Sequence, residues 1–306
     1  MSWFLLALVA PFLYATTNHI DKILLEKYFK DGGVGTLILF SALLSVLALP
    51  VILFADPTVL SVDLNNIFLL TGVAILDLAI LWFYLLALKG DEPSIIVVFY
   101  QLVPVLALVL GYLILGETLT TMQLVAMGVI IFGTTIVSFE IDDKNNFKLR
   151  KKTIILMSAA ALAWALESVL FKVVALEESV WRSLFWEHLV LVLAGLLIFT
   201  FVRSYRNHFL TALRNNSVAI LSLNGINEGL YMTGNIVVAF AVMLAPVALI
   251  LLGESFQSIF VLVIGILITI FLPKLSTEST ERKHIAQKLI AILITGIGTY
   301  ILLFVA

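Results

Sequence analysis

Ten apolar stretches, each about as long as a membrane-spanning helix, dominate this sequence. A bilayer core requires roughly 20 apolar residues per helix, and backbone polar groups in lipid must be satisfied within the segment itself. The sequence therefore predicts an all-α integral membrane protein with ten transmembrane helices. The stretches are Trp3–Ile20, Gly35–Phe54, Asn66–Leu88, Ser94–Leu115, Thr121–Phe139, Thr153–Ala175, Arg182–Val202, Ser217–Ala241, Pro246–Leu272 and Ala286–Val305.

Composition excludes the main alternative classes. The chain is 62% hydrophobic and 12% charged, whereas a soluble protein needs a larger polar share and a disordered chain more charge. A net charge of −2 without a basic stripe argues against nucleic-acid binding. The absence of cysteine excludes disulfides and thiolate sites. Lys22 is the first basic residue and follows the first apolar stretch, so we expect a retained helix rather than a signal peptide.

The charged stretch Ile141–Lys152 divides the chain into two parts, residues 1–140 and 153–306. An ordered series of short matches relates them: Tyr14 to Lys22 with Trp164 to Lys172, Tyr100-Gln101 with Phe256-Gln257, and Gly133-Thr134 with Gly298-Thr299. Because each part has five helices, the second crosses the membrane in the opposite sense. This predicts two inverted five-helix repeats, as in many secondary transporters. Chance similarity between apolar helices is the alternative.

The loop charges predict the orientation. Loops that follow odd-numbered helices carry 16 of the 18 Lys and Arg residues, when Lys22 and Lys288 are counted with the adjacent loops. The positive-inside rule places these loops in the cytoplasm and both termini outside. We expect a multi-pass protein of the plasma or inner membrane, with membrane lipid as a partner.

Several motifs in the first part resemble the ten-helix EamA branch of the drug/metabolite transporter superfamily. They are Tyr84-Leu85-Leu86-Ala87-Leu88-Lys89, Gln101-Leu102-Val103-Pro104-Val105, Gly116-Glu117-Thr118-Leu119, and the spaced glycines Gly128 and Gly133. The resemblance covers nearly the whole chain and implies a membrane transporter, with termini that are usually cytoplasmic. The loop charges predict the opposite orientation.

The second part departs from this pattern. Phe260 stands where the repeat places Pro104, and Leu272-Pro273-Lys274 stands where it places Gly116-Glu117-Thr118. A signature of its own, Gly253-Glu254-Ser255-Phe256-Gln257, occupies the ninth apolar stretch instead.

Five acids lie deep in the apolar stretches, and each costs on the order of 3 kcal/mol to insert. They are Asp77, Glu167, Glu187, Glu228 and Glu254. Such residues face a cavity, pair with a partner or titrate. One well-embedded base, Lys172, is too little to neutralise them, so we expect an acidic cavity or protonated acids.

Helical spacing groups the polar residues into faces. Asn224, Glu228, Tyr231 and Asn235 recur at steps of four, three and four, with Asn227 nearby. Interhelical hydrogen bonding is the structural alternative to binding. The predicted solute-binding residues are Asn18, Asp77, Gln101, Glu167, Asn224, Asn227, Glu228, Tyr231, Asn235, Glu254 and Gln257.

Other residues are ambiguous. Lys22 and Lys172 match in the repeat and either extend to the interface or form an internal salt bridge. Adjacent Glu187 and His188 point about 100° apart on a helix and rarely bind one ion, so we expect no metal and no cofactor. His188 is a candidate for proton handling. Some of the aromatic residues are candidates for a cation cage.

The sequence lacks recognisable enzyme motifs, so we expect no enzymatic activity. We predict a secondary transporter of a small cationic or zwitterionic metabolite, with protons as the coupling ion through Glu228 or Glu254. Anionic solutes would need deep Arg or Lys. Lipid-linked substrate flipping is the alternative within the same fold, and an intramembrane enzyme is the alternative class. The oligomeric state stays open.

Overall fold

The computed structural model describes residues 2–29, 33–116, 120–137, 139–141, 147–244, 246–273, 275 and 281–304. Its elements follow one another along the chain almost without irregular segments. They are α1 (Ser2–Ile23), a π-helix (Leu24–Tyr28), α2 (Gly33–Leu44), a 3₁₀ turn (Ser45–Leu47), α3 (Ala48–Ala55), α4 (Leu64–Leu88), α5 (Pro93–Phe99), α6 (Leu102–Leu115), α7 (Thr121–Val137), β1 (Phe139–Ile141), β2 (Phe147–Leu149), α8 (Lys151–Glu177), α9 (Val180–Phe201), α10 (Arg203–Ala241), α11 (Val247–Gly253), a 3₁₀ turn (Glu254–Phe256), α12 (Gln257–Phe271) and α13 (Arg282–Phe304).

Seven helical segments within the described part of the chain are long and apolar enough to cross a membrane. They are Gly33–Ala55, Leu64–Leu88, Pro93–Ile114, Lys151–Glu177, Val180–Phe201, Ile250–Phe271 and Arg282–Ile301. The fold is therefore that of a helical membrane protein. The three other predicted spans correspond to α1, α7 and α10, whose passage through the bilayer stays a prediction.

Two spans are interrupted at positions that match in the predicted repeat. α5 ends at Phe99 and α6 begins at Leu102, and the amide of Gln101 donates to the carbonyl of Val98 at 3.2 Å. Pro104 lacks the N–H that would bond four residues back, which accounts for this break. A 3₁₀ turn separates α11 from α12, and Gln257 begins α12 just as Gln101 precedes α6.

One prediction needs correction. The polar stretch 203–216, expected to be a loop between two spans, is helical, so that α10 has 39 residues. At 1.5 Å per residue this helix is about 58 Å long, well beyond the roughly 30 Å of the bilayer core. The predicted linker carries a two-stranded antiparallel hairpin, in which Phe139 pairs with Leu149 and Ile141 with Phe147. Residues 117–119, 142–146 and 274, which belong to predicted motifs and the linker, lie outside the described residues.

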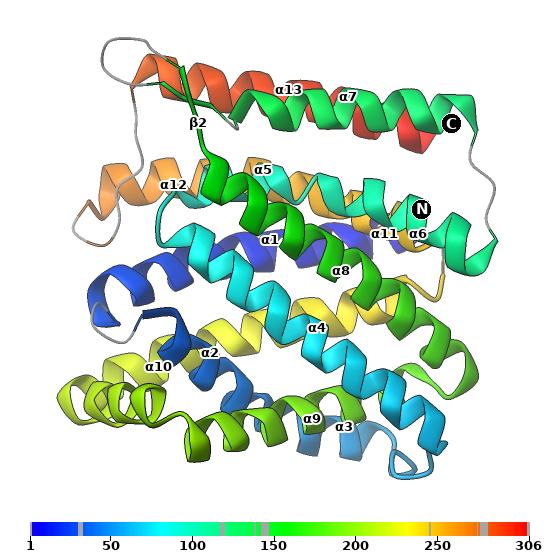
Figure 1. Cartoon of the computed structure of the whole chain (residues 1–306), viewed down its shortest axis with the longest axis vertical. Helices are drawn as coiled ribbons and strands as arrows, with labels where there is room; N and C mark the ends of the chain where they lie inside the picture. The colour runs from blue at the N-terminus through cyan, green and yellow to red at the C-terminus, as the bar shows by residue number, and fades with distance from the viewer. Residues whose placement is uncertain are drawn as a thin grey trace.

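Helices from the two parts of the chain pack in pairs. α1 lies against α10, α4 against α8, α2 against α9, α6 against α11, and α7 against α13. Figure 1 shows α7 and α13 along one edge of the molecule and α3 and α9 along the opposite edge. Each pair combines a helix of residues 1–140 with one of residues 153–306, so the centre of the molecule is shared by both parts.

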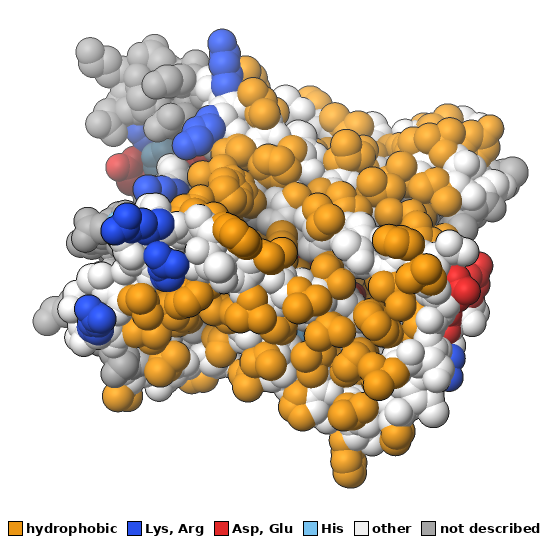
Figure 2. Space-filling model, turned by 60° about the horizontal axis from the view of Figure 1, so that its bottom comes forward, with side chains coloured by type: hydrophobic (Ala, Val, Ile, Leu, Met, Phe, Trp, Pro, Cys, Tyr) orange, Lys and Arg blue, Asp and Glu red, His pale blue; other side chains and the backbone are white. Residues whose placement is uncertain are grey.

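The two ends of the bundle differ in charge. Figure 2 shows Lys and Arg side chains gathered at one end, with a band of apolar side chains over the middle of this face. The hairpin and the start of α10 lie at this basic end, whereas α8 passes to α9 at the other (Figure 1). We call these the basic end and the opposite end.

Candidate functional site

A central cavity of about 100 Å³ lies among side chains of both parts of the chain. α1, α2, α4, α8, α9 and α10 contribute most of its wall, and Tyr100 and Gln257 contribute from the two interrupted spans. Of the predicted binding residues, the structure places these at the wall: Asn18, Asp77, Glu167, Asn227, Glu228, Tyr231, Asn235 and Gln257.

Asp21 is the centre of the most connected part of this wall. Its carboxylate accepts hydrogen bonds from Asn227 Nδ2 at 2.7 Å and from the hydroxyl of Tyr84 at 3.1 Å. Asn18 Nδ2 donates to the same hydroxyl at 2.8 Å, and Gln257 Nε2 donates to Asn18 Oδ1 at 2.7 Å. Four helical segments, α1, α4, α10 and α12, thus meet around one buried carboxylate.

Asp21 was not among the predicted binding residues. It lies three residues after Asn18 and seven after Tyr14, on one face of α1. This spacing was the signal in the sequence that could have identified it. The exposed fraction of Asp21 is only 6%.

The other carboxylates of the wall also have neutral partners. Tyr231 donates its hydroxyl hydrogen to Asp77 Oδ1 at 2.9 Å, and Ser168 donates to Glu167 Oε2 at 3.0 Å. Ser41 donates to Glu228. No Lys or Arg lines this cavity among the described residues. The four carboxylates are therefore held by hydroxyl and amide groups and not by a fixed positive charge.

Aromatic rings cover one side of the cavity. The ring centre of Trp164 lies 5.0 Å from that of Tyr100 and 6.4 Å from that of Tyr14, both edge to face. Tyr14 also lies 5.6 Å from Tyr231, and its hydroxyl donates to Asn235 Oδ1 at 3.1 Å. The structure thus brings three of the candidate cage aromatics, Tyr100, Trp164 and Tyr231, together with Tyr14 around one space.

Three predicted binding residues do not line the cavity. Gln101 donates from Nε2 to Ser258 Oγ at 3.2 Å and thereby joins the two interrupted spans. Asn224 donates to the carbonyl of Ile220 at 2.8 Å, one turn back in its own helix. Glu254 lies in the 3₁₀ turn before α12, and its Oε2 has no hydrogen-bond partner among the described residues.

Neither histidine in the apolar stretches belongs to a metal centre in the described part of the chain. His188 lines the central cavity, and its Nδ1 lies 2.9 Å from the carbonyl oxygen of Leu184. Nε2 of His19 lies 2.9 Å from the carbonyl oxygen of Val261. Within the described residues, no group of three His, Asp or Glu side chains is arranged to hold an ion.

The loop between α4 and α5 ties several helices together at the basic end. Lys22 donates to the carbonyl oxygens of Leu88 and Asp91, each at 2.8 Å. With 7% of its surface exposed, Lys22 does not extend to the interface. The carboxylate of Asp91 contacts Arg150 and Thr153. Glu92 forms an ion pair with Lys288 of α13. α1, α8 and α13 are thus linked to one short loop.

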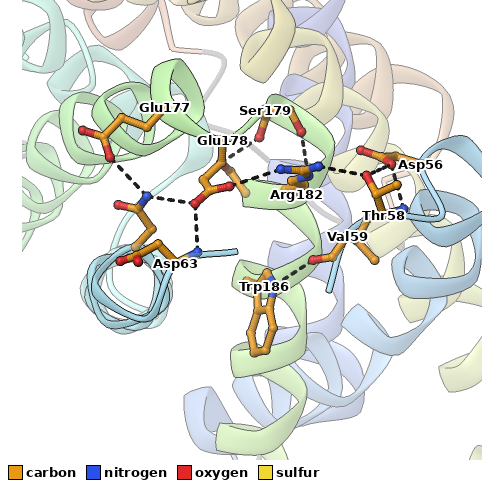
Figure 3. A network of polar contacts seen from close by, with 11 residues as sticks. Asp56, Thr58, Val59, Asp63, Glu177, Glu178, Ser179, Arg182 and Trp186 are labelled. Carbon is orange, nitrogen blue, oxygen red and sulfur yellow. Dashed lines mark hydrogen bonds and ion pairs between the residues drawn. The ribbon is translucent and has the colours of Figure 1, made fainter. Parts of the chain in front are cut away.

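A second polar network closes the opposite end and is drawn in Figure 3. Glu178, just after α8, accepts hydrogen bonds from Asn66 Nδ2 at 3.0 Å and from the amide of Asp63 at 2.9 Å. Arg182 lies 3.4 Å from Glu178 and donates to Thr58 at 3.1 Å. The network therefore joins the α3–α4 loop to the α8–α9 corner.

Two acids of this network, Glu178 and Asp56, lie outside the membrane-spanning helices and are stabilised in the charged form. The hydrogen bond from Asn66, the amide of Asp63 and the nearby Arg182 hold the pKa of Glu178 below its usual value. Hydrogen bonds from the hydroxyl and amide of Thr58 likewise lower the pKa of the exposed Asp56.

Comparison with known proteins agrees with this architecture. Residues 1–139 match the EamA-like transporter family. This is the EamA family of the drug/metabolite transporter superfamily, which the motifs that begin at Tyr84 and Gln101 resemble. The apolar spans and this match fit a multi-pass membrane protein.

The whole chain shares its fold with a protein of known structure. A protein of known crystal structure aligns with 100% of this chain and 97% of its own, with a TM-score of 0.60 and 15% sequence identity. At that identity the likeness concerns the fold alone. No curated protein sequence matches the chain.

Proposed function

We propose that this EamA-like protein is a secondary transporter of a small organic cation or zwitterion, and that it exchanges the solute for protons by alternating access. The observation that carries the proposal is the central cavity, whose wall holds four carboxyl groups and no Lys or Arg among the described residues.

The charge of the cavity favours cations. Asp21, Asp77, Glu167 and Glu228 lie at its wall, and each would cost several kcal/mol as an isolated buried anion. A cationic solute offsets this cost, and so does a bound proton. An anionic solute would require Arg or Lys side chains that donate hydrogen bonds to it and balance its charge.

The shape and lining of the cavity favour a small amine. A volume of about 100 Å³ suits a solute of few atoms. The rings of Tyr14, Tyr100 and Trp164 meet there, and aromatic faces attract an ammonium group with about 0.5–2 kcal/mol per contact. The amides of Asn18, Asn227 and Asn235 add hydrogen-bonding groups that suit a carboxylate or hydroxyl on the same solute.

Alternating access is supported by the way in which the two parts of the chain pack. Helix pairs such as α1 with α10 and α8 with α4 are the pairs that a twofold relation between residues 1–140 and 153–306 would produce. Both interrupted spans break at matching positions, as is common around solute sites in transporters with inverted repeats. We propose that α1, α7 and α10 complete ten spans, with the basic end in the cytoplasm and both termini outside.

Proton exchange is assigned to Glu228. Its carboxyl group lines the cavity and, among the described residues, accepts a hydrogen bond from the hydroxyl of Ser41 alone. A proton and a cationic solute would compete for this group, which couples their movements. Glu254, the other predicted coupling residue, lies outside the cavity wall and is a candidate for a second proton site.

Ligand-dependent melting of the detergent-solubilised protein tests this proposal. The panel contains choline, putrescine, glycine, sucrose and citrate at acidic and alkaline pH. A ligand at 100 times its dissociation constant adds roughly 2.7 kcal/mol of stability. We expect stabilisation by the amines, loss of it in Glu228→Gln, and no loss in Glu281→Gln, whose side chain is 59% exposed. Stabilisation by citrate alone would refute the charge argument.

A further inference from the structure

A second, smaller cavity of about 30 Å³ adjoins the central one. Tyr14, Trp164, Glu167 and Asn235 line both. Glu187 of α9 lines only the smaller cavity, whereas His188 and Leu191 of the same helix line the central one. Glu167 therefore stands between the two spaces, and Glu187 lies one step farther from the solute.

Glu187 is a buried carboxyl group that has no hydrogen-bond partner among the described residues. Its exposed fraction is 2%, and no described side chain or backbone group donates to it. Glu167 receives one hydrogen bond, from Ser168. A carboxylate in an apolar interior normally requires several donors or an opposite charge. The geometry of Glu187 thus indicates a group that carries a cation of its own.

The described residues that interact electrostatically with this pair of carboxyl groups are acidic. Glu187 interacts electrostatically with Glu167 of α8 and with Asp77 of α4. The other polar groups at the small cavity are Tyr14 of α1, Ser168 of α8 and Asn235 of α10, which are neutral. Lys172 of α8 is not among the residues that line either cavity. Two neighbouring carboxyl groups in such a space cannot both ionise unless a cation joins them.

The pair lies on the side of the cavity that faces the opposite end of the bundle. Glu187 is seven residues after the start of α9, which is about 10 Å along the helix axis. Glu167 is ten residues before the end of α8, about 15 Å from the same end. Figure 1 shows that α8 passes directly to α9 there.

We infer that Glu187 and Glu167 form a proton site separate from the solute site, through which the coupling proton reaches the central cavity from the opposite end. The O–H bond on Glu187 breaks as one forms on a carboxylate oxygen of Glu167, and Asp77 is the next acceptor toward Glu228. Charge and atoms balance, since one proton moves and no electron does. This inference rests on the proposed proton-coupled function for its role but not for the existence of the site.

Infrared difference spectroscopy tests the site without any solute. Spectra of the protein in lipid nanodiscs are compared between acidic and alkaline pH, and the carbonyl band of protonated carboxyl groups is measured. We expect a component of this band to disappear in Glu187→Gln and to persist in Glu187→Asp and in the surface control Glu281→Gln. An unchanged band in Glu187→Gln would overturn the inference. Loss of the band from the unmodified protein when Na⁺ is added at constant pH would also overturn it.

Transport of radiolabelled choline into liposomes tests the route. One proton exchanged per solute supports about tenfold accumulation per pH unit of gradient, because one unit corresponds to 1.36 kcal/mol. We expect Glu187→Gln to keep choline counterflow, which needs no net proton movement, and to lose accumulation driven by the gradient. Accumulation equal to that of the unmodified protein would overturn the route.

The two proposals fail in different ways. If the unmodified protein does not exchange choline or the other amines, the proposed solute class is wrong, while the infrared result still decides the proton site. If exchange occurs and Glu187→Gln keeps both counterflow and gradient-driven accumulation, the solute class stands and the separate proton site is wrong.

Discussion

Replacing Asp91 by asparagine tests whether the polar cluster at the basic end holds the central cavity closed on that side. The carboxylate of Asp91 contacts Arg150 and Thr153, and its carbonyl accepts from Lys22. The substitution keeps the size of the side chain and the backbone contact to Lys22 but removes the charge that pairs with Arg150. The two side chains of this ion pair are only 9% and 12% exposed.

The size of the effect follows from this burial. Removing one partner of a buried ion pair costs about 3–5 kcal/mol. Because asparagine keeps an oxygen that can accept from Arg150, we expect a cost at the lower end, about 3 kcal/mol. In the alternating-access scheme this contact exists only while the basic end is closed. A loss of about 3 kcal/mol from the closed state alone changes the ratio of closed to open molecules by roughly a hundredfold.

Because the chain contains no cysteine, a single introduced thiol reports access to the cavity. Ser45 lines the cavity, and Ser45→Cys is nearly isosteric. The assay measures how fast a membrane-impermeant thiol reagent labels this cysteine from each face of oriented membranes. With Asp91→Asn present, we expect faster labelling from the basic side, by up to about a hundredfold, and slower labelling from the other side.

The matched control is Asp56→Asn, which removes an acid from the opposite end. Asp56 accepts hydrogen bonds from Thr58 in an exposed loop, so this change is expected to leave labelling from the basic side as it was. Equal labelling rates with and without Asp91→Asn, in protein that melts normally, would refute the role of this cluster as a closure.

Three further predictions concern stability and the cavity wall. The hydrogen bond from Asn66 lowers the pKa of Glu178 in the folded protein. The stability that Glu178 contributes is therefore complete above pH about 4.3, its pKa in the unfolded chain, and is lost as the pH falls through the folded pKa. The melting temperature should decline in that acidic range, and should decline less in Glu178→Gln. Gly298→Ala should lower the free energy of unfolding by about 1–3 kcal/mol, because the new Cβ would lie 3.0 Å from a backbone nitrogen of α7. Gly296→Ala is the control: its Cβ would meet nothing within 4 Å, so the same denaturation experiment should show no change. Tyr84→Phe should lower the free energy of unfolding by about 1–3 kcal/mol and weaken choline binding measured by calorimetry. The reason is that Asn18 and Asp21 both lose their hydrogen bond to the Tyr84 hydroxyl. Unchanged values would show that water replaces this hydroxyl.

Local properties of the sequence predicted much of the helical architecture. Apolar length identified the seven helices that are long and apolar enough to cross a membrane, and helical spacing placed Glu228, Tyr231 and Asn235 on one face of α10. These features depend on residues a few positions apart. The continuation of α10 back to Arg203 was missed because polar composition resembles that of a loop, although nothing in that stretch prevents a helix.

The neighbours of each carboxyl group depend on the tertiary structure. Asp21 and Asn227 are 206 residues apart in sequence, and Tyr14 and Asn235 are 221 apart, so no periodicity within a helix indicates their contact. The same buried-acid signal that selected Glu228 also selected Glu254, which packing leaves outside the cavity wall.

The sequence by itself determined that the chain folds in a membrane, because the apolar stretches and the imbalance of loop charges are properties of the unfolded chain. Only the tertiary structure decided that Glu167 and Glu187 share one small cavity and that Asp91 and Glu92 together join three helices at the basic end. The physical reason is that insertion energy depends on each segment alone, whereas a polar site depends on which faces of different helices pack together.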